Sequence, residues 1–376
     1  MSLAYDDEQR LLADTARDFL TERSPVDAQR ALRDRQDPLG FEPSLWQEMV
    51  EMGWSAVPFG EAHGGLDFGY QGLGVICKAM GRQLSPAPLL SSVVLCGSLL
   101  EGLEDPVRVA DLLPPLIAGE WRPALALEEG RHHQVLPRVC KARASTEGYC
   151  LDGEKSWVVD GVGADAYLVT ALMEEGDPAL FLVPAESAGL SVESLTLVDS
   201  RNGARLRLER VLLGREQLLA RGEACIALLD TALDRGRACL AAELLGASEA
   251  LFEMTLEYLK TRRQFDVPIG SFQALQHRCA WLHVELALAR STAMAALEAV
   301  DQESAERAGL VSLAKWKMGA VAERVSREAV QLHGGIGVTD ELDVGLYLKR
   351  IRVAQACLGD GDYHLDRYAS AVEAEA

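Results

Sequence analysis

The stretch KTRRQFDVPIGSFQ, residues 260–273, joins two long helical segments and is the part of the chain that best indicates its fold. Arg262 and Arg263 fall in the last turn of the first helix, where cations offset the negative end of the helix dipole. Pro268 and Gly270 restrict the loop that follows. Two interpretations fit these residues: a capped turn between helices, or an arginine pair that holds a pyrophosphate.

A second glycine-rich stretch, QLHGGIGVT, covers residues 331–339. Gly334 is typical of the left-handed residue that ends a helix. Three glycines within four positions exceed what one helix end requires, and they would let a ring or a phosphate approach the backbone closely. A helix cap and a ligand site both remain open here. For His333 we favour a packed histidine at the helix end over an acid or base.

The hydrophobic periodicity outward from these two stretches predicts three domains. After about residue 222 the pattern predicts a bundle of long helices. Before that, alternating apolar and polar residues predict short strands, with Asp152-Gly153 as a hairpin turn. The fold class is α+β, and we expect an N-terminal helical domain over 1–120, a β-barrel domain over 121–215 and a C-terminal helical bundle over 216–376.

Composition excludes several classes of function. The net charge of −20 over 376 residues argues against a nucleic-acid surface, which needs clustered Lys and Arg. The 8 cysteines are scattered without a C-x-x-C pair, so we expect free thiols and no metal site. No apolar run is long enough for membrane insertion, and the acidic start is no signal peptide. We therefore expect a soluble, cytoplasmic protein.

Taken together, the two stretches resemble the acyl-CoA dehydrogenase family. The pattern R-x-F-x-x-P-I-x-x-F-Q occupies 263–273, and Q-x-x-G-G-x-G occupies 331–337. Gly153-Glu154-Lys155-Ser156-Trp157 is similar to the family's glycine, lysine and tryptophan in the β domain. Within the family, 258–276, 331–337 and the ending 358–362 are most similar to the small-subunit type of pimeloyl-CoA dehydrogenase.

The resemblance implies a flavoprotein that removes two hydrogens from an acyl-CoA thioester with FAD as cofactor. It implies that FAD is shared between subunits, so we expect a homo- or hetero-oligomer, with an electron-transfer flavoprotein as the electron acceptor. It assigns Arg263 to the FAD pyrophosphate of a neighbouring subunit and Trp157 to the flavin. The remaining residues implied to bind the cofactor are Phe265 and Gln273 beside it, and Gln331, Gly334 and Gly335 at its adenosine end.

The chain departs from the family pattern at the catalytic base. Most members carry a Glu immediately before Gly-Thr, and here Leu358 occupies that position. Some members place the base on the first bundle helix, and here that position is Gly236. The candidate bases are Asp360 and Asp234, each two residues from an expected site, which on a helix is another face. An N-cap at Asp360 and a solvated helix-end charge at Asp234 are the alternative interpretations. Val159 also stands where a Thr or Ser commonly bonds the flavin.

Three hypotheses about function therefore stay open. The chain is an FAD-dependent acyl-CoA dehydrogenase, acting alone with a displaced Asp base or as one subunit of a heteromer. Alternatively, it is a non-catalytic subunit that completes the FAD site of a partner. The third hypothesis is a flavin oxidase or monooxygenase on the same fold, because fold does not determine chemistry.

Overall fold

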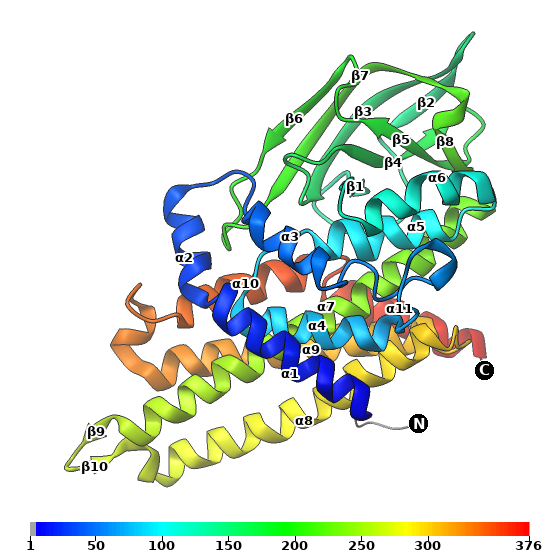
Figure 1. Ribbon diagram of the computed structural model, residues 1–376. Helices are drawn as coiled ribbons and strands as arrows, with labels where there is room; N and C mark the ends of the chain where they lie inside the picture. The colour runs from blue at the N-terminus through cyan, green and yellow to red at the C-terminus, as the bar shows by residue number, and fades with distance from the viewer. Residues whose placement is uncertain (1–4, 376) are drawn as a thin grey trace. The chain divides into compact units, whose positions relative to one another are not determined.

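The computed structural model describes residues 5–375, in which a helical region, a β region and a helical bundle follow one another (Figure 1). This order confirms the predicted fold class. The first region consists of α1 (Asp7–Arg23), α2 (Val26–Arg35), α3 (Pro43–Glu51), the 3-10 helix η1 (Glu61–His63), α4 (Gly69–Gln83), the π-helical η2 (Leu89–Gly97), α5 (Ser98–Glu101) and α6 (Pro106–Ile117).

The β region forms one mixed sheet whose strands follow the order β6-β7-β3-β2-β4-β5-β8, while β1 pairs with β4 in parallel. Within residues 5–375 the pairings leave β6 and β8 at the two ends, so the sheet is an open path where we expected a closed barrel. The strands are β1 (Pro123–Ala126), β2 (Lys141–Ala144), β3 (Gly148–Val159), β4 (Ala166–Met173), β5 (Pro178–Pro184), β6 (Leu190–Ser194), β7 (Gly203–Gly214) and, after the 3-10 helix η3 (Arg215–Gln217), β8 (Leu218–Arg221).

The third region confirms the predicted bundle of long helices, of which α7 is the longest. No helix within residues 5–375 is both long and apolar enough to cross a membrane. The elements are α7 (Glu223–Thr261), β9 (Arg263–Gln264), β10 (Val267–Pro268), the 3-10 helix η4 (Ile269–Ser271), α8 (Gln273–Asp301), α9 (Arg307–His333), the 3-10 helix η5 (Gly334–Val338), α10 (Val344–Ala356) and α11 (Gly361–Glu375).

The chain divides into two compact units. The first contains residues up to 31, 70–85 and 237 onward, and the second contains 32–69 and 86–236. The bundle helices from residue 237 onward therefore share a unit with α1 and α4, while the first part of α7 and all strands of the large sheet lie in the other unit. The domain boundaries near residues 120 and 215 stay a prediction.

Asp152-Gly153 is not a hairpin turn, as the sequence suggested, because β3 continues through both residues. The register of β3 against β7 shifts between Leu151 and Gly153, which is a β-bulge. Gly153 has a φ of +151°, and a Cβ there would lie 2.5 Å from the Cα of Cys140. Glycine is thus required because two backbones approach closely inside the sheet. A glycine in a turn and a glycine at such a close approach cannot be distinguished from the sequence.

In the first unit, α4 packs against α7 backbone to backbone. A Cβ on Gly81 would lie 2.0 Å from the carbonyl oxygen of Glu243, and a Cβ on Gly246 would lie 1.9 Å from that of Lys78. Neither glycine has a positive φ, so the requirement is space and not backbone conformation. The two glycines let the helices approach closely enough for their charged side chains to meet.

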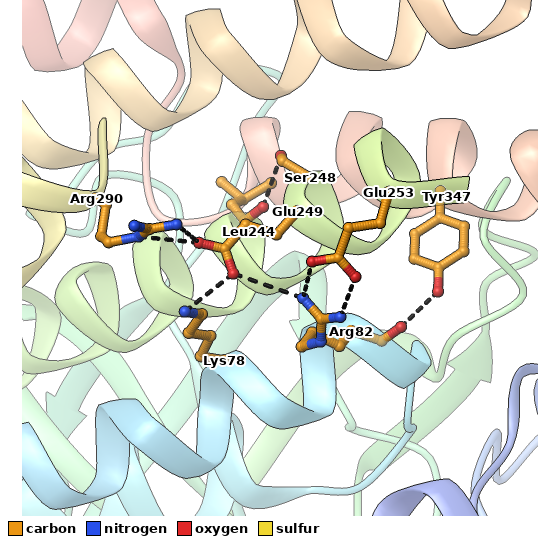
Figure 2. Close-up of polar contacts among 8 residues, drawn as sticks. All are labelled: Lys78, Arg82, Leu244, Ser248, Glu249, Glu253, Arg290 and Tyr347. Atoms are coloured by element: carbon orange, nitrogen blue, oxygen red, sulfur yellow. Dashed lines mark hydrogen bonds and ion pairs between the residues drawn. The ribbon is translucent and has the colours of Figure 1, made fainter. Parts of the chain in front are cut away.

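Those side chains form an ion network around Glu249, which is 8% exposed (Figure 2). Its carboxylate lies 2.9 Å from Lys78 Nζ and 2.7 Å from Arg290 Nη2, and Arg82 Nη1 lies 3.6 Å away. Arg82 also pairs with Glu253 at 2.5 Å. One nearly buried carboxylate on α7 therefore joins α4 and α8 through three cations.

Candidate functional site

Residues 263–268 form the hairpin of β9 and β10, with Phe265 and Asp266 at its tip. Their φ angles are +52° and +64°. A bulky side chain with a positive φ is strained, and such strain clusters at binding sites. Phe265 is also 86% exposed. Arg263 is exposed as well, and its Nη2 donates to the carbonyl oxygen of Asp266 at 2.5 Å. An exposed cation beside a strained, exposed aromatic ring is typical of a surface that binds a ligand.

The Gln331–Gly335 segment ends α9 and begins η5. Gly334 has a φ of +64° and follows the last residue of α9, so it does cap the helix. The surroundings of the three glycines differ. Within the described residues, a Cβ on Gly334 or Gly335 would meet nothing within 4 Å, whereas one on Gly337 would lie 2.8 Å from the carbonyl oxygen of Val330. Gly334 and Gly335 thus face open space, and Gln331 beside them is exposed.

The structure brings the two segments to the same end of the bundle. The ring of Tyr258, near the end of α7, stacks on His333 with centroids 4.5 Å apart. Tyr258 also accepts the backbone N–H of Arg262, which leads into the hairpin. His333 is buried, and its Nδ1 donates to the carbonyl oxygen of Ala329 at 2.8 Å. This histidine therefore packs at the helix end, in line with the interpretation favoured from the sequence. Gln273 is exposed at the first position of α8.

Trp157 lies on β3 in the second unit. Its backbone bridges to Glu128, and the preceding Ser156 donates its N–H to the Glu128 carbonyl oxygen at 2.7 Å. Among the described residues the indole Nε1 is buried and has no hydrogen-bond partner. An unsatisfied buried donor costs about 1–3 kcal/mol. A ligand that presents an acceptor to Nε1 would remove that cost.

Lys155 holds this part of β3 in place and does not face a ligand. It is fully buried, and its Nζ donates to the carbonyl oxygen of Leu127, to Glu129 Oε1 at 2.8 Å and to Thr170 Oγ1. Burial alone would raise the pKa of Glu129, but the charge of Lys155 and its hydrogen bonds lower it overall. The lysine of the Gly-Glu-Lys-Ser-Trp motif thus forms an internal ion pair with Glu129.

The turn between α10 and α11 contains Leu358, at the position where the resemblance places a glutamate. Leu358 is 6% exposed and has a φ of +58°. Its carbonyl oxygen accepts from Arg237 Nε at 3.0 Å and from His364 Nε2 at 3.2 Å. Lys315 Nζ donates to the next carbonyl oxygen, that of Gly359, at 3.1 Å. All three basic side chains are buried, so basic groups from α7, α9 and α11 hold this turn.

The tautomer of His364 follows from its partners. A carbonyl only accepts, so Nε2 carries the hydrogen, and Nδ1 accepts from Ser312 Oγ at 3.4 Å. Burial first, and then the charges of Lys315, Arg237 and Arg367, lower the pKa of His364 to about 2. Burial also lowers the pKa of Lys315 to about 8. The turn is therefore held by one neutral and two cationic donors near pH 7.

Neither candidate aspartate is shown to act as a base. Asp360 is exposed, and its Oδ1 accepts the backbone N–H of Tyr363 at 3.0 Å, which makes it the N-cap of α11. Asp234 is fully buried on α7 rather than solvated, and it belongs to the second unit. Their catalytic roles stay predictions, as do the cofactor contacts of the residues named above.

Sequence reasoning missed the three basic residues around Leu358. Arg237 stands at the start of the apolar run Ala238–Ala242 and Lys315 just after Leu313 and Ala314, and the side chain of Arg237 is among the largest that are fully buried. A cation at the edge of an apolar run in a long helix is the weak signal that could have found them, because a buried charge needs a partner. His364 carries no such signal, since one isolated histidine is not informative.

Replacing His364 should change how stability depends on pH. The folded chain keeps this imidazole neutral down to about pH 2, whereas an unfolded histidine takes up a proton below about 6.5. Below that pH the unfolded state thus binds more protons than the folded state. The free energy of unfolding should therefore decrease by about 1.4 kcal/mol for each pH unit below pH 6. His364→Gln should lack this contribution. Urea unfolding of wild type and His364→Gln at pH 4.5 and pH 6 measures this contribution. An equal change in the free energy of unfolding of the two proteins between these pH values would contradict the prediction.

Comparison with known proteins identifies the family of the chain. The N-terminal domain model of acyl-CoA dehydrogenases matches residues 6–120, and the C-terminal domain model matches 226–373. The chain belongs to the acyl-CoA dehydrogenase family. The similarity to the small-subunit type of pimeloyl-CoA dehydrogenase stays a prediction.

Individual relatives of the family align over nearly the whole chain. The mitochondrial 2-methylacyl-CoA dehydrogenase of Solanum tuberosum is 27% identical, covering 96% of this chain and 89% of its own length. Acyl-CoA dehydrogenase IpdE2 of Mycolicibacterium smegmatis is 28% identical, and the alignment covers 97% of this chain and 99% of the length of that protein. The ChsE4-ChsE5 complex from Mycobacterium tuberculosis contains a chain with a TM-score of 0.89 and 26% identity, covering 99% of both chains.

Proposed function

We propose that this chain is the subunit of a heteromeric, FAD-dependent acyl-CoA dehydrogenase that lacks the catalytic base. The observation that carries the proposal is the turn at Leu358. A side chain that cannot ionise occupies the base position, and the basic residues Arg237 and His364 bind its carbonyl oxygen. A related solved structure is a complex of two named components, ChsE4 and ChsE5. This supports a complex in which two different subunits have different roles.

Each unit, taken by itself, has residues that fit a part of FAD. Arg263 offers an exposed guanidinium for a pyrophosphate, and Gly334 and Gly335 leave open space in front of the backbone. The buried Nε1 of Trp157 has no hydrogen-bond acceptor among residues 5–375. Each of these features fits a large, flat, anionic cofactor.

Bound FAD supplies the hydride acceptor for the β-carbon of the acyl-CoA. In our proposal, Arg263 on the hairpin binds the pyrophosphate, and Gln331 with the two glycines contacts the adenosine end. Trp157 would lie against the flavin, and its buried indole N–H would be available to an acceptor on the cofactor. The α-proton then passes to a carboxylate of the partner subunit, since Leu358 cannot accept it. Electrons leave the complex through an electron-transfer flavoprotein.

The cofactor part of the proposal is tested by Arg263→Ala, with Lys260→Ala as a matched control. Lys260 is an exposed cation three residues away that pairs with Glu257. Loss of a hydrogen bond from a charged group costs about 1.5–3 kcal/mol, so Arg263→Ala should weaken FAD binding by about 10- to 150-fold. Lys260→Ala should bind FAD like the wild type.

FAD content and affinity are measured on the chain as purified, alone or in its complex. Arg263→Ala should keep the circular-dichroism spectrum and the unfolding midpoint of the wild type. Flavin occupancy in Arg263→Ala equal to that in Lys260→Ala would show that the pyrophosphate is bound elsewhere. Rapid oxygen consumption during acyl-CoA turnover would favour an oxidase over a dehydrogenase.

A further inference from the structure

Residues 131–146 form a cationic segment in an otherwise acidic chain. They contain four Arg or Lys residues and no Asp or Glu, whereas the whole chain has 57 acidic residues and 37 basic ones. Within residues 5–375 the side chains of these four make no ion pair and no hydrogen bond: Arg131, Arg138, Lys141 and Arg143. Other cations of the same sheet do have partners, as Arg221 has in Asp177. The segment is therefore able to bind an anion from outside the chain.

Strand β2 presents two of these cations on the outer face of the sheet. Ala142 is buried in the core of the sheet, so Lys141 and Arg143 on either side of it point to the opposite face. The chain that leads into β2 is fixed, because the carboxylate of Glu129 accepts the backbone N–H groups of residues 138–140 at 2.6, 2.6 and 3.1 Å. The cations therefore stand on a well-ordered part of the sheet.

The outer face continues across β3 to β7. The register places Arg143 opposite Cys150 on β3, and Cys150 opposite Leu212 on β7. Leu212 is 71% exposed. Arg210, two residues before it, is exposed and has no side-chain partner among the described residues. An aliphatic side chain thus protrudes beside unpaired cations. We name these residues, with the segment that precedes β2, the cationic face: Arg131, Arg138, Lys141, Arg143, Arg210 and Leu212.

Carboxylates near the cationic face are fewer than its cations. On β2, β3, β7 and the turn between β2 and β3, the carboxylates without an ion pair among residues 5–375 are Glu147, Asp152 and Glu209. Asp152 lies opposite Lys141, and its Oδ1 accepts the backbone N–H of Arg210 at 2.9 Å. Five cations against three carboxylates leave the face positively charged.

We propose that the cationic face binds the surface of a lipid bilayer that contains anionic phospholipid. A bilayer offers phosphates above a hydrocarbon layer, which matches cations around a protruding aliphatic side chain. Leu136 and Val139, which are 48% and 55% exposed, add apolar surface within the same segment. A nucleic acid or free phosphate has no apolar layer for these side chains. An acidic protein would need carboxylates at fixed positions, whereas phospholipids diffuse to wherever the cations lie.

The net charge of −20 does not prevent this contact. The Debye length is about 8 Å at physiological ionic strength, so the bilayer interacts mainly with charges at the contact. The binding is peripheral, and it goes beyond the proposed function because it needs neither the cofactor nor the base. Failure of lipid binding would leave the FAD proposal untouched, and the reverse also holds.

Sedimentation of the full chain with lipid vesicles tests the proposal. Wild type should bind phosphatidylcholine vesicles that contain about one-third phosphatidylglycerol, should not bind pure phosphatidylcholine, and should be released at high salt. Each Lys or Arg near an anionic surface changes the binding constant about 5-fold, so Lys141→Gln/Arg143→Gln should weaken binding about 30-fold. Leu212→Ser should weaken it about 10-fold or more, because apolar surface leaves the bilayer.

The matched control is Arg10→Gln/Lys260→Gln, which changes the net charge equally at two exposed cations that pair with Asp7 and Glu257. This variant should bind vesicles like the wild type. Arg131→Gln/Arg138→Gln changes the cationic face outside β2 and should also weaken binding about 30-fold, so the test does not depend on the folding of the β2 variant.

Several results would overturn the proposal. These are equal binding of wild type to the two kinds of vesicle, equal weakening in the control, and wild-type binding by both cation pairs or by Leu212→Ser. Binding of poly-glutamate or inorganic phosphate without binding of vesicles would assign the face to a soluble anion or an acidic protein instead.

Discussion

Wild-type chain without a partner subunit should leave the α-proton of an acyl-CoA unexchanged in deuterium oxide, and Leu358→Glu should exchange it. A positioned general base contributes about 100- to 10,000-fold to a rate, so the difference should be of that size. Leu358 is buried in a turn that Arg237 and His364 hold through its carbonyl oxygen, which leaves its side chain free to be replaced. Mass spectrometry of the recovered acyl-CoA measures the exchange.

The matched control is Leu358→Gln, which has the size of glutamate but cannot take a proton. Asp360→Asn and Asp234→Asn test the displaced bases. If wild type exchanges the proton and Asp360→Asn or Asp234→Asn abolishes the exchange, that aspartate is the base and the chain is catalytic by itself. Exchange by wild type that survives both Asn substitutions would mean that the base is some other group.

Removing the carboxylate of Glu249 should destabilise the chain strongly. Glu249→Ala would leave Lys78 and Arg290 without the group that lies 2.9 and 2.7 Å away in the network of Figure 2. Breaking a buried ion pair costs about 3–5 kcal/mol. The matched control is Glu253→Ala, whose side chain is 58% exposed and whose pair with Arg82 should contribute about 1 kcal/mol or less.

Urea unfolding of both variants measures the comparison. An equal loss of stability in the two variants would mean that water reaches the cations around Glu249 and replaces their partner. A loss confined to Glu249→Ala would show that this carboxylate ties α4 and α8 to α7, as the distances indicate.

Local patterns explain why much of the fold could be predicted. The long helices α7 and α9 are runs of helix-forming residues without proline, so their existence follows from local composition. The role of Gly153 could not be predicted, because the sequence does not show that a Cβ there would lie 2.5 Å from the Cα of Cys140. A turn and a close approach of two backbones both favour glycine, and only the packing distinguishes them.

The sequence by itself determined the order of helical, β and bundle regions and the two stretches that offer an arginine and glycines to a cofactor. These are properties of neighbouring residues. Only the tertiary structure decided what surrounds Leu358, since Arg237 donates to its carbonyl oxygen from 121 residues away and Lys315 reaches the next carbonyl from 44 residues away. It also decided that Asp360 caps a helix and that, in the part of the chain that the structure describes, Trp157 Nε1 is buried without a hydrogen-bond partner. Burial and hydrogen-bond partners depend on which distant segments of the chain come into contact. These contacts cannot be predicted from the pattern of neighbouring residues.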